Sequence, residues 1–159
     1  MAAQTGRTVQ DFTDLKIGAA GGSMYSMKID SVGDVGLNYE EIDMYAFVDA
    51  VKGILTGKPD FSLDFGGPVD NTATSGPSTL LRAWVGVPTA LSFDFQCGIR
   101  HAWEAGEPQF GVTGVVASNS GCMVTKYSES GGKYSATIRM IAGSAAAPAW
   151  GTAAETVPA

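Results

Sequence analysis

Cys97 and His101, four positions apart, have the chemistry of a nucleophile and a base. An imidazole can take the proton of a nearby thiol, and the thiolate can then attack a carbonyl carbon. Cys97, however, alternates in phase with Phe93 and Phe95, which predicts an apolar environment and a raised thiol pKa. His101 is the only histidine and lies in the polar segment GIRHAWEAGE, where we expect a solvated loop. The spacing therefore does not predict a catalytic pair.

Carboxylates form the second group that could do chemistry. Asp60 and Asp64 lie four apart in one alternating segment, and Glu40, Glu41 and Asp43 lie upstream. Paired carboxylates can serve acid–base catalysis or hold calcium. No D-x-D-x-D-G loop is present, and acidic residues that alternate with apolar ones usually face water. We expect solvated strand faces here.

The glycine-rich segments GAAGG and GDVG match neither a P-loop nor a dinucleotide fingerprint. With no assembled nucleophile, base and oxyanion donor, the sequence predicts a protein that is not an enzyme and has no catalytic, cofactor-binding or metal-binding residues.

Composition favours a structural role. Charged residues make up 16% of the 159 residues and hydrophobic residues 45%, which suggests that copies or partners cover much of the surface. The net charge is −6, and the ten Lys and Arg residues form no basic run. Tight binding of nucleic acid through its phosphates is therefore not expected.

Cys97 and Cys122 both lie in apolar alternating segments. We expect buried free thiols, with a disulfide as the alternative. The first residues, MAAQTGRTVQDF, lack an apolar signal core, and no stretch is long enough to span a bilayer. We expect no membrane association and a protein that is soluble in the cytoplasm where it is made.

The elements that would position these residues are mostly strands. Residues 1–14 are expected to form an N-terminal arm, 15–143 a β domain, and 144–159 a C-terminal arm. Within the domain, Pro77 and Gly86 bracket a short helix whose buried side is Leu80, Leu81 and Trp84. The predicted β segments are MYSMKI, LNYEEIDMYAF, DFSLDF, ALSFDFQCG, QFGVTGVVAS, CMVTKYS and KYSATIRMIAG. Sequential strands joined by short turns favour an antiparallel sandwich or barrel.

The stretch from Tyr39 to Gly67 fits two periods. Met44, Phe47, Val48 and Val51 recur at helical spacing, whereas the residues of DFSLDF alternate as in a strand. Glycines at 53 and 57 and a proline at 59 oppose a continuing helix. We expect strand, loop and strand, with at most a helical turn or two within 46–54.

Taken in order, the segments from DLKIG (Asp14 to Gly18) to about Gly143 resemble a tail tube (major tail) protein of long-tailed bacteriophages. The resemblance rests on EEIDMYAF, on the glycine-bearing loop before DFSLDF, on the short helix, on PQFGVTG, and on the closing KYSATIRMIAG. In this family a Thr usually stands within the segment that reads MYAF here.

The resemblance implies a mainly β protein: an antiparallel β-sandwich or half-barrel with one short flanking α-helix and a long extended loop. Six copies would form a ring, and stacked rings would form the tube through which DNA leaves the capsid. Partners would be other copies, the tape measure protein, and the tail terminator and baseplate proteins, with DNA passing transiently through the bore. The protein would reside in the virion tail after assembly in the bacterial cytoplasm.

For such a subunit we expect two sets of functional residues, one for the contact between rings and one for the bore. Val48, Val51, Ile54 and Leu55 are the expected contacts between rings, because exposed apolar side chains suit a loop that becomes buried on a neighbour. Asp64 and Asp94 are candidate acids of the bore, where negative charge would repel phosphates.

Two other classes compete. One is a capsid decoration protein of β-sandwich fold, and the other is a carbohydrate-binding sandwich that uses Trp84, Trp103 and Trp150 as stacking platforms. Trp84 fits the predicted core better, and the other two are single aromatics in loops.

Overall fold

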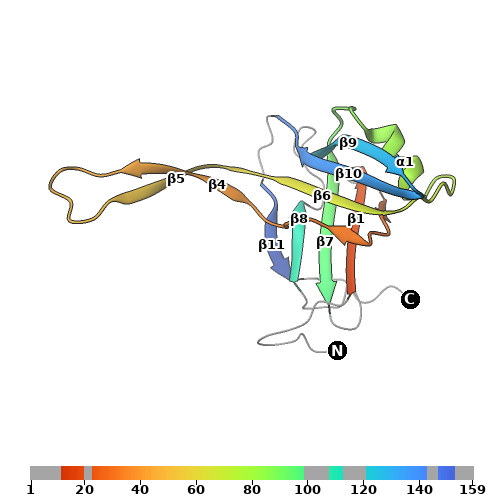
Figure 1. The fold of residues 1–159 in the computed structure, drawn as a ribbon, viewed down its shortest axis with the longest axis horizontal. Coiled ribbons are helices and arrows are strands. Elements are labelled where there is room, and N and C mark those ends of the chain that lie inside the picture. The colour runs from red at the N-terminus through yellow and green to blue at the C-terminus, as the bar shows by residue number, and fades with distance from the viewer. Residues whose placement is uncertain (1–11, 20–22, 99–107, 113–120, 143–146, 153–159) are drawn as a thin grey trace.

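The computed structural model describes residues 12–19, 23–98, 108–112, 121–142 and 147–152. The protein is mainly β, with antiparallel strands and one short helix, as the sequence predicted (Figure 1). The elements are β1 (Phe12–Ala19), β2 (Met24–Ser26), β3 (Ser31–Val32), β4 (Asn38–Met44), β5 (Gly53–Asp60), β6 (Ser62–Pro68), α1 (Pro77–Trp84), β7 (Leu91–Gly98), β8 (Pro108–Val112), β9 (Cys122–Ser130), β10 (Lys133–Met140) and β11 (Ala149–Thr152).

The body consists of two groups of strands that cross one another in Figure 1. One group has the order β2-β1-β7-β8-β11, and the other has the order β9-β10-β6-β3. They join where Leu91 of β7 pairs with Cys122 of β9. This arrangement is consistent with the antiparallel sandwich expected from sequential short strands.

The core lies between the two groups and is rich in aromatic rings. Phe61 stacks on Phe93 with ring centroids 4.9 Å apart, and Phe110 packs against both rings. Phe65 meets Tyr134 edge to face. These side chains come from both layers, so their packing holds the layers together.

The helix α1 covers part of this core. Pro77 occupies its first turn, and Gly86, with φ of +75°, follows its end in a conformation that favours glycine. Leu81 is fully buried, and Leu80 and Trp84 pack partly against the core. The predicted helix is confirmed, and Trp84 is a core contact rather than an open platform.

Strands extend into both segments that were expected to be arms. β1 begins at Phe12, and residues 149–152 form β11, which pairs with β8. The Trp150 ring packs on Phe110 at a centroid distance of 4.9 Å, although Trp150 remains 55% exposed. The tail therefore contributes a strand because one aromatic residue gives it a packing partner.

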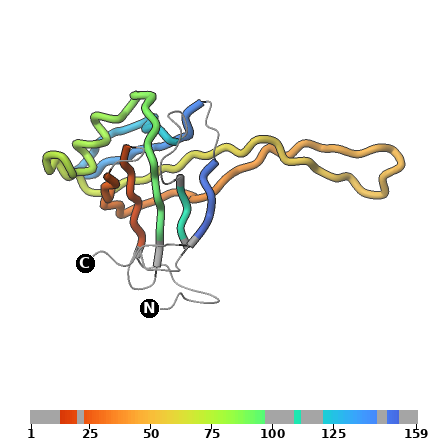
Figure 2. The backbone as a smooth tube through the Cα atoms, turned by 180° about the vertical axis from the view of Figure 1, so that it is seen from behind, coloured from red at the N-terminus to blue at the C-terminus, as the bar shows by residue number. Residues whose placement is uncertain are grey.

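The hairpin formed by β4 and β5 extends far from the body (Figures 1 and 2). β5 leads through Phe61 directly into β6, so one nearly continuous stretch of strand runs from the hairpin into the core. Phe61 is only 2% exposed. The hairpin is therefore anchored at its base by a core aromatic.

Candidate interaction surface

The hairpin is a two-stranded antiparallel ribbon that forms a sheet of its own. Its register places Glu41 opposite Thr56, Ile42 opposite Leu55, and Asp43 opposite Ile54. An irregularity between Tyr39 and Glu41 separates this outer part from the base. The strand expected at EEIDMYAF is confirmed up to Met44, whereas residues 53–59, which were expected to be part of the loop, form most of β5.

The tip is a tight turn. The Asp49 amide donates to the Ala46 carbonyl oxygen at 2.9 Å, and the Ala46 amide donates to Asp49 Oδ2 at 2.7 Å. Lys52 Nζ lies 5.0 Å from the centroid of the Tyr45 ring, a cation–π contact. The possible helix within 46–54 is limited to this one turn, and Gly53 already belongs to β5.

All four residues predicted for the contact between rings are exposed. Val48 is 92% exposed and Val51 79%, while Ile54 and Leu55 are both 54% exposed. The structure gathers them on one hairpin: Val48 and Val51 at the tip, and the other two on β5. Their packing against another molecule remains a prediction.

Sequence reasoning missed other members of this surface. The further exposed large apolar side chains of the hairpin are Tyr39, Ile42, Met44, Tyr45 and Phe47. The alternation of Ile42 and Met44 was a usable signal, but it competed with the helical period. Phe47, at the tip, is fully exposed.

This concentration of apolar surface is large for one chain. Scaling ordinary side-chain areas by these exposures gives roughly 700 Å² over the tip and both faces, against roughly 300–600 Å² for the largest patch of a typical monomer. A stable interface buries about 800 Å² on each partner. The hairpin can therefore supply most of one side of such an interface.

The two candidate acids of the bore differ in their surroundings. Asp64 is exposed on β6, where its Oδ1 accepts a hydrogen bond from Thr137 Oγ1 at 2.5 Å. Asp94 on β7 is only 7% exposed, and Gln109 Nε2 donates to its Oδ2 at 2.6 Å. Because Asp94 is enclosed within the body, its carboxylate is poorly placed to face a bore, and Asp64 alone remains a candidate.

Asp60 and Asp64 do not form a carboxylate pair. Arg139 Nη2 donates to both oxygens of Asp60, at 3.1 and 3.3 Å, where the hairpin meets the body. Asp64 instead meets Thr137. The two acids thus serve separate contacts with β10.

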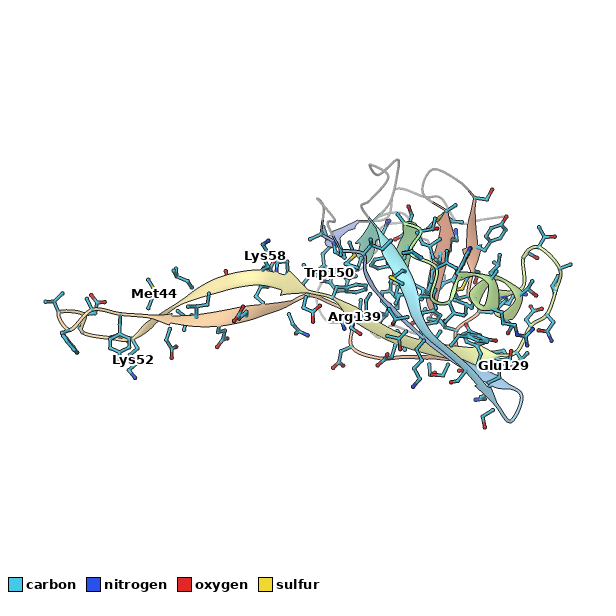
Figure 3. All side chains as sticks on the ribbon, turned by 90° about the horizontal axis from the view of Figure 1, so that it is seen from above. Met44, Lys52, Lys58, Glu129, Arg139 and Trp150 are labelled. Carbon is cyan, nitrogen blue, oxygen red and sulfur yellow. The ribbon has the colours of Figure 1, made fainter. Side chains whose placement is uncertain are left out.

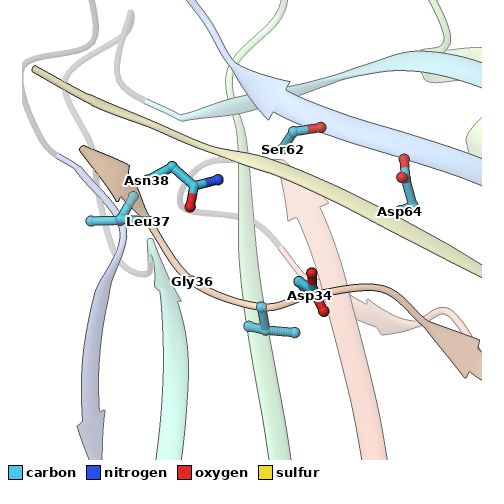
Figure 4. Close-up of a pocket in the computed structure, with 7 residues that line it drawn as sticks. Asp34, Gly36, Leu37, Asn38, Ser62 and Asp64 are labelled. Carbon is cyan, nitrogen blue, oxygen red and sulfur yellow. The ribbon is translucent and has the colours of Figure 1, made fainter. Parts of the chain in front are cut away.

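A shallow polar pocket lies beside the base of the hairpin (Figure 4). Its lining combines the segment before β4 and the first residue of β4 with two residues of β6: Asp34, Val35, Gly36, Leu37, Asn38, Ser62 and Asp64. The Gly33 amide donates to the Asp64 carbonyl oxygen at 2.8 Å and holds the two segments together. The polar side chains of the lining are the carboxylates of Asp34 and Asp64, the amide of Asn38 and the hydroxyl of Ser62.

Cys122 is a buried free thiol, as predicted. Burial raises its pKa to about 12, so it carries no thiolate near neutral pH. His101, Trp103 and the side chain of Cys97 lie outside the described residues. Within the described part of the chain, His, Cys, Asp and Glu side chains nowhere gather in a group of three that could hold a metal ion.

No model of a known protein family matches the chain, and no curated protein matches it. In the ranges that the structure covers, none of the helices has the length and apolar character needed to cross a bilayer.

Proposed function

We propose that this protein is the tail tube subunit of a long-tailed bacteriophage, which assembles into stacked six-membered rings around a bore for DNA. The observation that carries the proposal is the projecting hairpin, whose large apolar side chains are exposed and do not belong to the core cluster of the described residues. Such a surface is costly in water and is stabilised when another molecule covers it.

The position of the hairpin supports an open polymer. It extends from one side of the body, so a hairpin that docks on the body of a neighbour joins two unlike surfaces (Figures 1 and 2). Contacts between unlike surfaces close into rings or propagate as filaments. Rings that stack through such arms form a tube.

The charges of the body suit a conduit that does not hold DNA. Four of its cations are engaged in ion pairs: Lys28 with Asp70, Arg82 with Glu129, Lys133 with Asp30, and Arg139 with Asp60. Cations already paired with carboxylates release fewer counterions when they meet phosphates. With a net charge of −6, the subunit would let the polymer slide.

Sedimentation velocity over a wide range of protein concentrations tests the proposal. We expect monomers or rings when the protein is dilute and much larger species when it is concentrated. In the phage, partners such as the tape measure and terminator proteins would set the length and the ends of the tube. A single monomer species at every concentration, also with tail initiating proteins present, would overturn it.

A further inference from the structure

The two faces of the hairpin differ in chemistry. Residues directly opposite in an antiparallel pair point to the same face, and successive residues point to opposite faces. Ile42 and Leu55 therefore share one face, which Met44 also joins. Figure 3 shows Met44 on one side of the ribbon and Lys52 on the other. We call the outer part of this face, with Ile42, Met44 and Leu55, the apolar face; Glu40, beside Gly57, lies at its inner end toward the body.

The opposite face mixes apolar and charged groups. Asp43 lies opposite Ile54 and Glu41 lies opposite Thr56. We call the face that carries Glu41, Asp43 and Ile54 the acidic face. Burying its carboxylates without partners would cost far more than burying Ile54 returns.

We propose that the apolar face packs against a second copy of this chain, while the acidic face stays in water, so that Ile54 lies outside the contact expected for it from the sequence. This inference rests on the proposed function and adds the orientation of the arm. A second copy is the chosen occupant because the tip residues Phe47, Val48 and Val51 and the apolar face together hold most of the exposed apolar area of the hairpin, a large part of what one side of a stable interface needs. In a polymer of identical subunits, that occupant is present at every contact.

Gly53 provides an independent observation on the same face. It pairs with Met44 and lies two residues before Leu55, so a side chain there would project from the apolar face. An added Cβ would meet only the Met44 carbonyl oxygen at 3.5 Å, an ordinary contact. The free chain therefore has room for a side chain at this position.

A glycine within a strand weakens it and often marks a place where another backbone approaches closely. Gly57 is different, because a Cβ there would lie 3.1 Å from two atoms of the Glu40 side chain. Crowding inside the hairpin thus accounts for Gly57 but not for Gly53. Close approach of a second copy to the apolar face accounts for Gly53.

Ile54 and Leu55 offer a matched pair of variants. They are neighbours on β5, are equally exposed at 54%, and lie on opposite faces. The test compares Leu55→Asp with Ile54→Asp in the full chain, using the critical concentration for assembly as the readout and circular dichroism to confirm folding.

We expect Leu55→Asp to raise the critical concentration by at least about tenfold, which corresponds to about 1.4 kcal/mol per contact. Ile54→Asp should change it less than about threefold, well under 1.4 kcal/mol. Equal effects of the two variants, or a larger effect of Ile54→Asp, would overturn the proposal while leaving self-assembly intact. A parent chain that never assembles would overturn both this inference and the proposed function.

Two further variants keep the test independent of added charge. Gly53→Val should fold and melt like the parent but fail to assemble. In assembled protein, Leu55→Cys should resist labelling by a charged maleimide, while Ile54→Cys should react. Labelling of the unsubstituted parent measures the background reaction of its own thiols. Normal assembly of Gly53→Val, or rapid labelling of Leu55→Cys, would contradict packing on the apolar face.

Discussion

Removing the outer hairpin should separate folding from assembly. In the variant, Ile42 to Leu55 is replaced by Asn-Gly, which joins Glu41 to Thr56. These two residues lie directly opposite one another, and a two-residue Asn-Gly turn connects such a pair. Every residue that is removed is exposed, so the core loses nothing.

The magnitudes follow from this exposure. Changes at exposed positions usually alter the free energy of unfolding by no more than about 0.5 kcal/mol. The shorter connection should stabilise the fold by at most about 2 kcal/mol. The variant should therefore melt at or slightly above the temperature of the parent.

The loss for assembly is much larger. Burial of all of the roughly 700 Å² of apolar surface at about 25 cal/mol per Å² would give at most about 18 kcal/mol before costs, and association alone costs about 4–15 kcal/mol. Without the hairpin this gain disappears and only monomers or isolated rings should remain.

Thermal melting followed by circular dichroism and sedimentation velocity measure the two effects on the same samples. A control with Phe47, Val48 and Val51 changed to Ser keeps the hairpin length and should also assemble poorly. If the shortened variant is unfolded, the hairpin is part of the core after all. If it assembles like the parent, the contact lies elsewhere on the body.

Three other outcomes are expected. Phe93→Ala should lower the free energy of unfolding by about 3–5 kcal/mol in urea titrations, because the ring is fully buried against Phe61; a loss below about 1 kcal/mol would contradict the packing described. Hydrogen bonds from Lys28 and, to a smaller extent, from Thr72 lower the pKa of Asp70 well below its ordinary value of 3.8. The ionised carboxylate therefore stabilises the fold above pH 3.8, and this contribution is lost as the pH falls toward the pKa of the folded state. Asp70→Asn should accordingly melt below the parent at pH 7, with the gap closing in acid; a gap that does not depend on pH would refute the ion pair as its cause. Gel-shift titration should detect no tight binding of duplex DNA at physiological salt, and tight, salt-sensitive binding would show that the surface had been misjudged.

Sequence patterns predicted the secondary structure and burial of a strand best where one of its faces is buried and the other is exposed. In β6, Leu63 and Phe65 are buried while Ser62 and Asp64 are exposed, so the alternation could be read directly. In β4 every residue is exposed, so no core selects the apolar positions and the helical and strand periods compete.

β7 shows the opposite failure. Its polar residues Ser92, Asp94 and Gln96 are buried together with Phe93 and Phe95. An alternating pattern predicts that the polar face meets water, but β7 is enclosed on both faces within the body. This is why Asp94 was a reasonable candidate for the bore from its sequence and a poor one in the structure.

β11 could not be predicted from its composition. The segment around it consists of small residues and proline, which indicate an irregular tail. Only Trp150 signals a packing partner, and the ring it contacts, Phe110, lies on a strand distant in the sequence. Pairing between such distant segments depends on the assembled sheet.

Electron microscopy of the concentrated, purified protein tests the central claim most directly. The account predicts hollow tubes built of stacked six-fold rings, with density from each subunit reaching into the adjacent ring where the β4–β5 hairpin would lie. Single particles without rings or tubes at every concentration, or trimers that bind only to capsids, would contradict it.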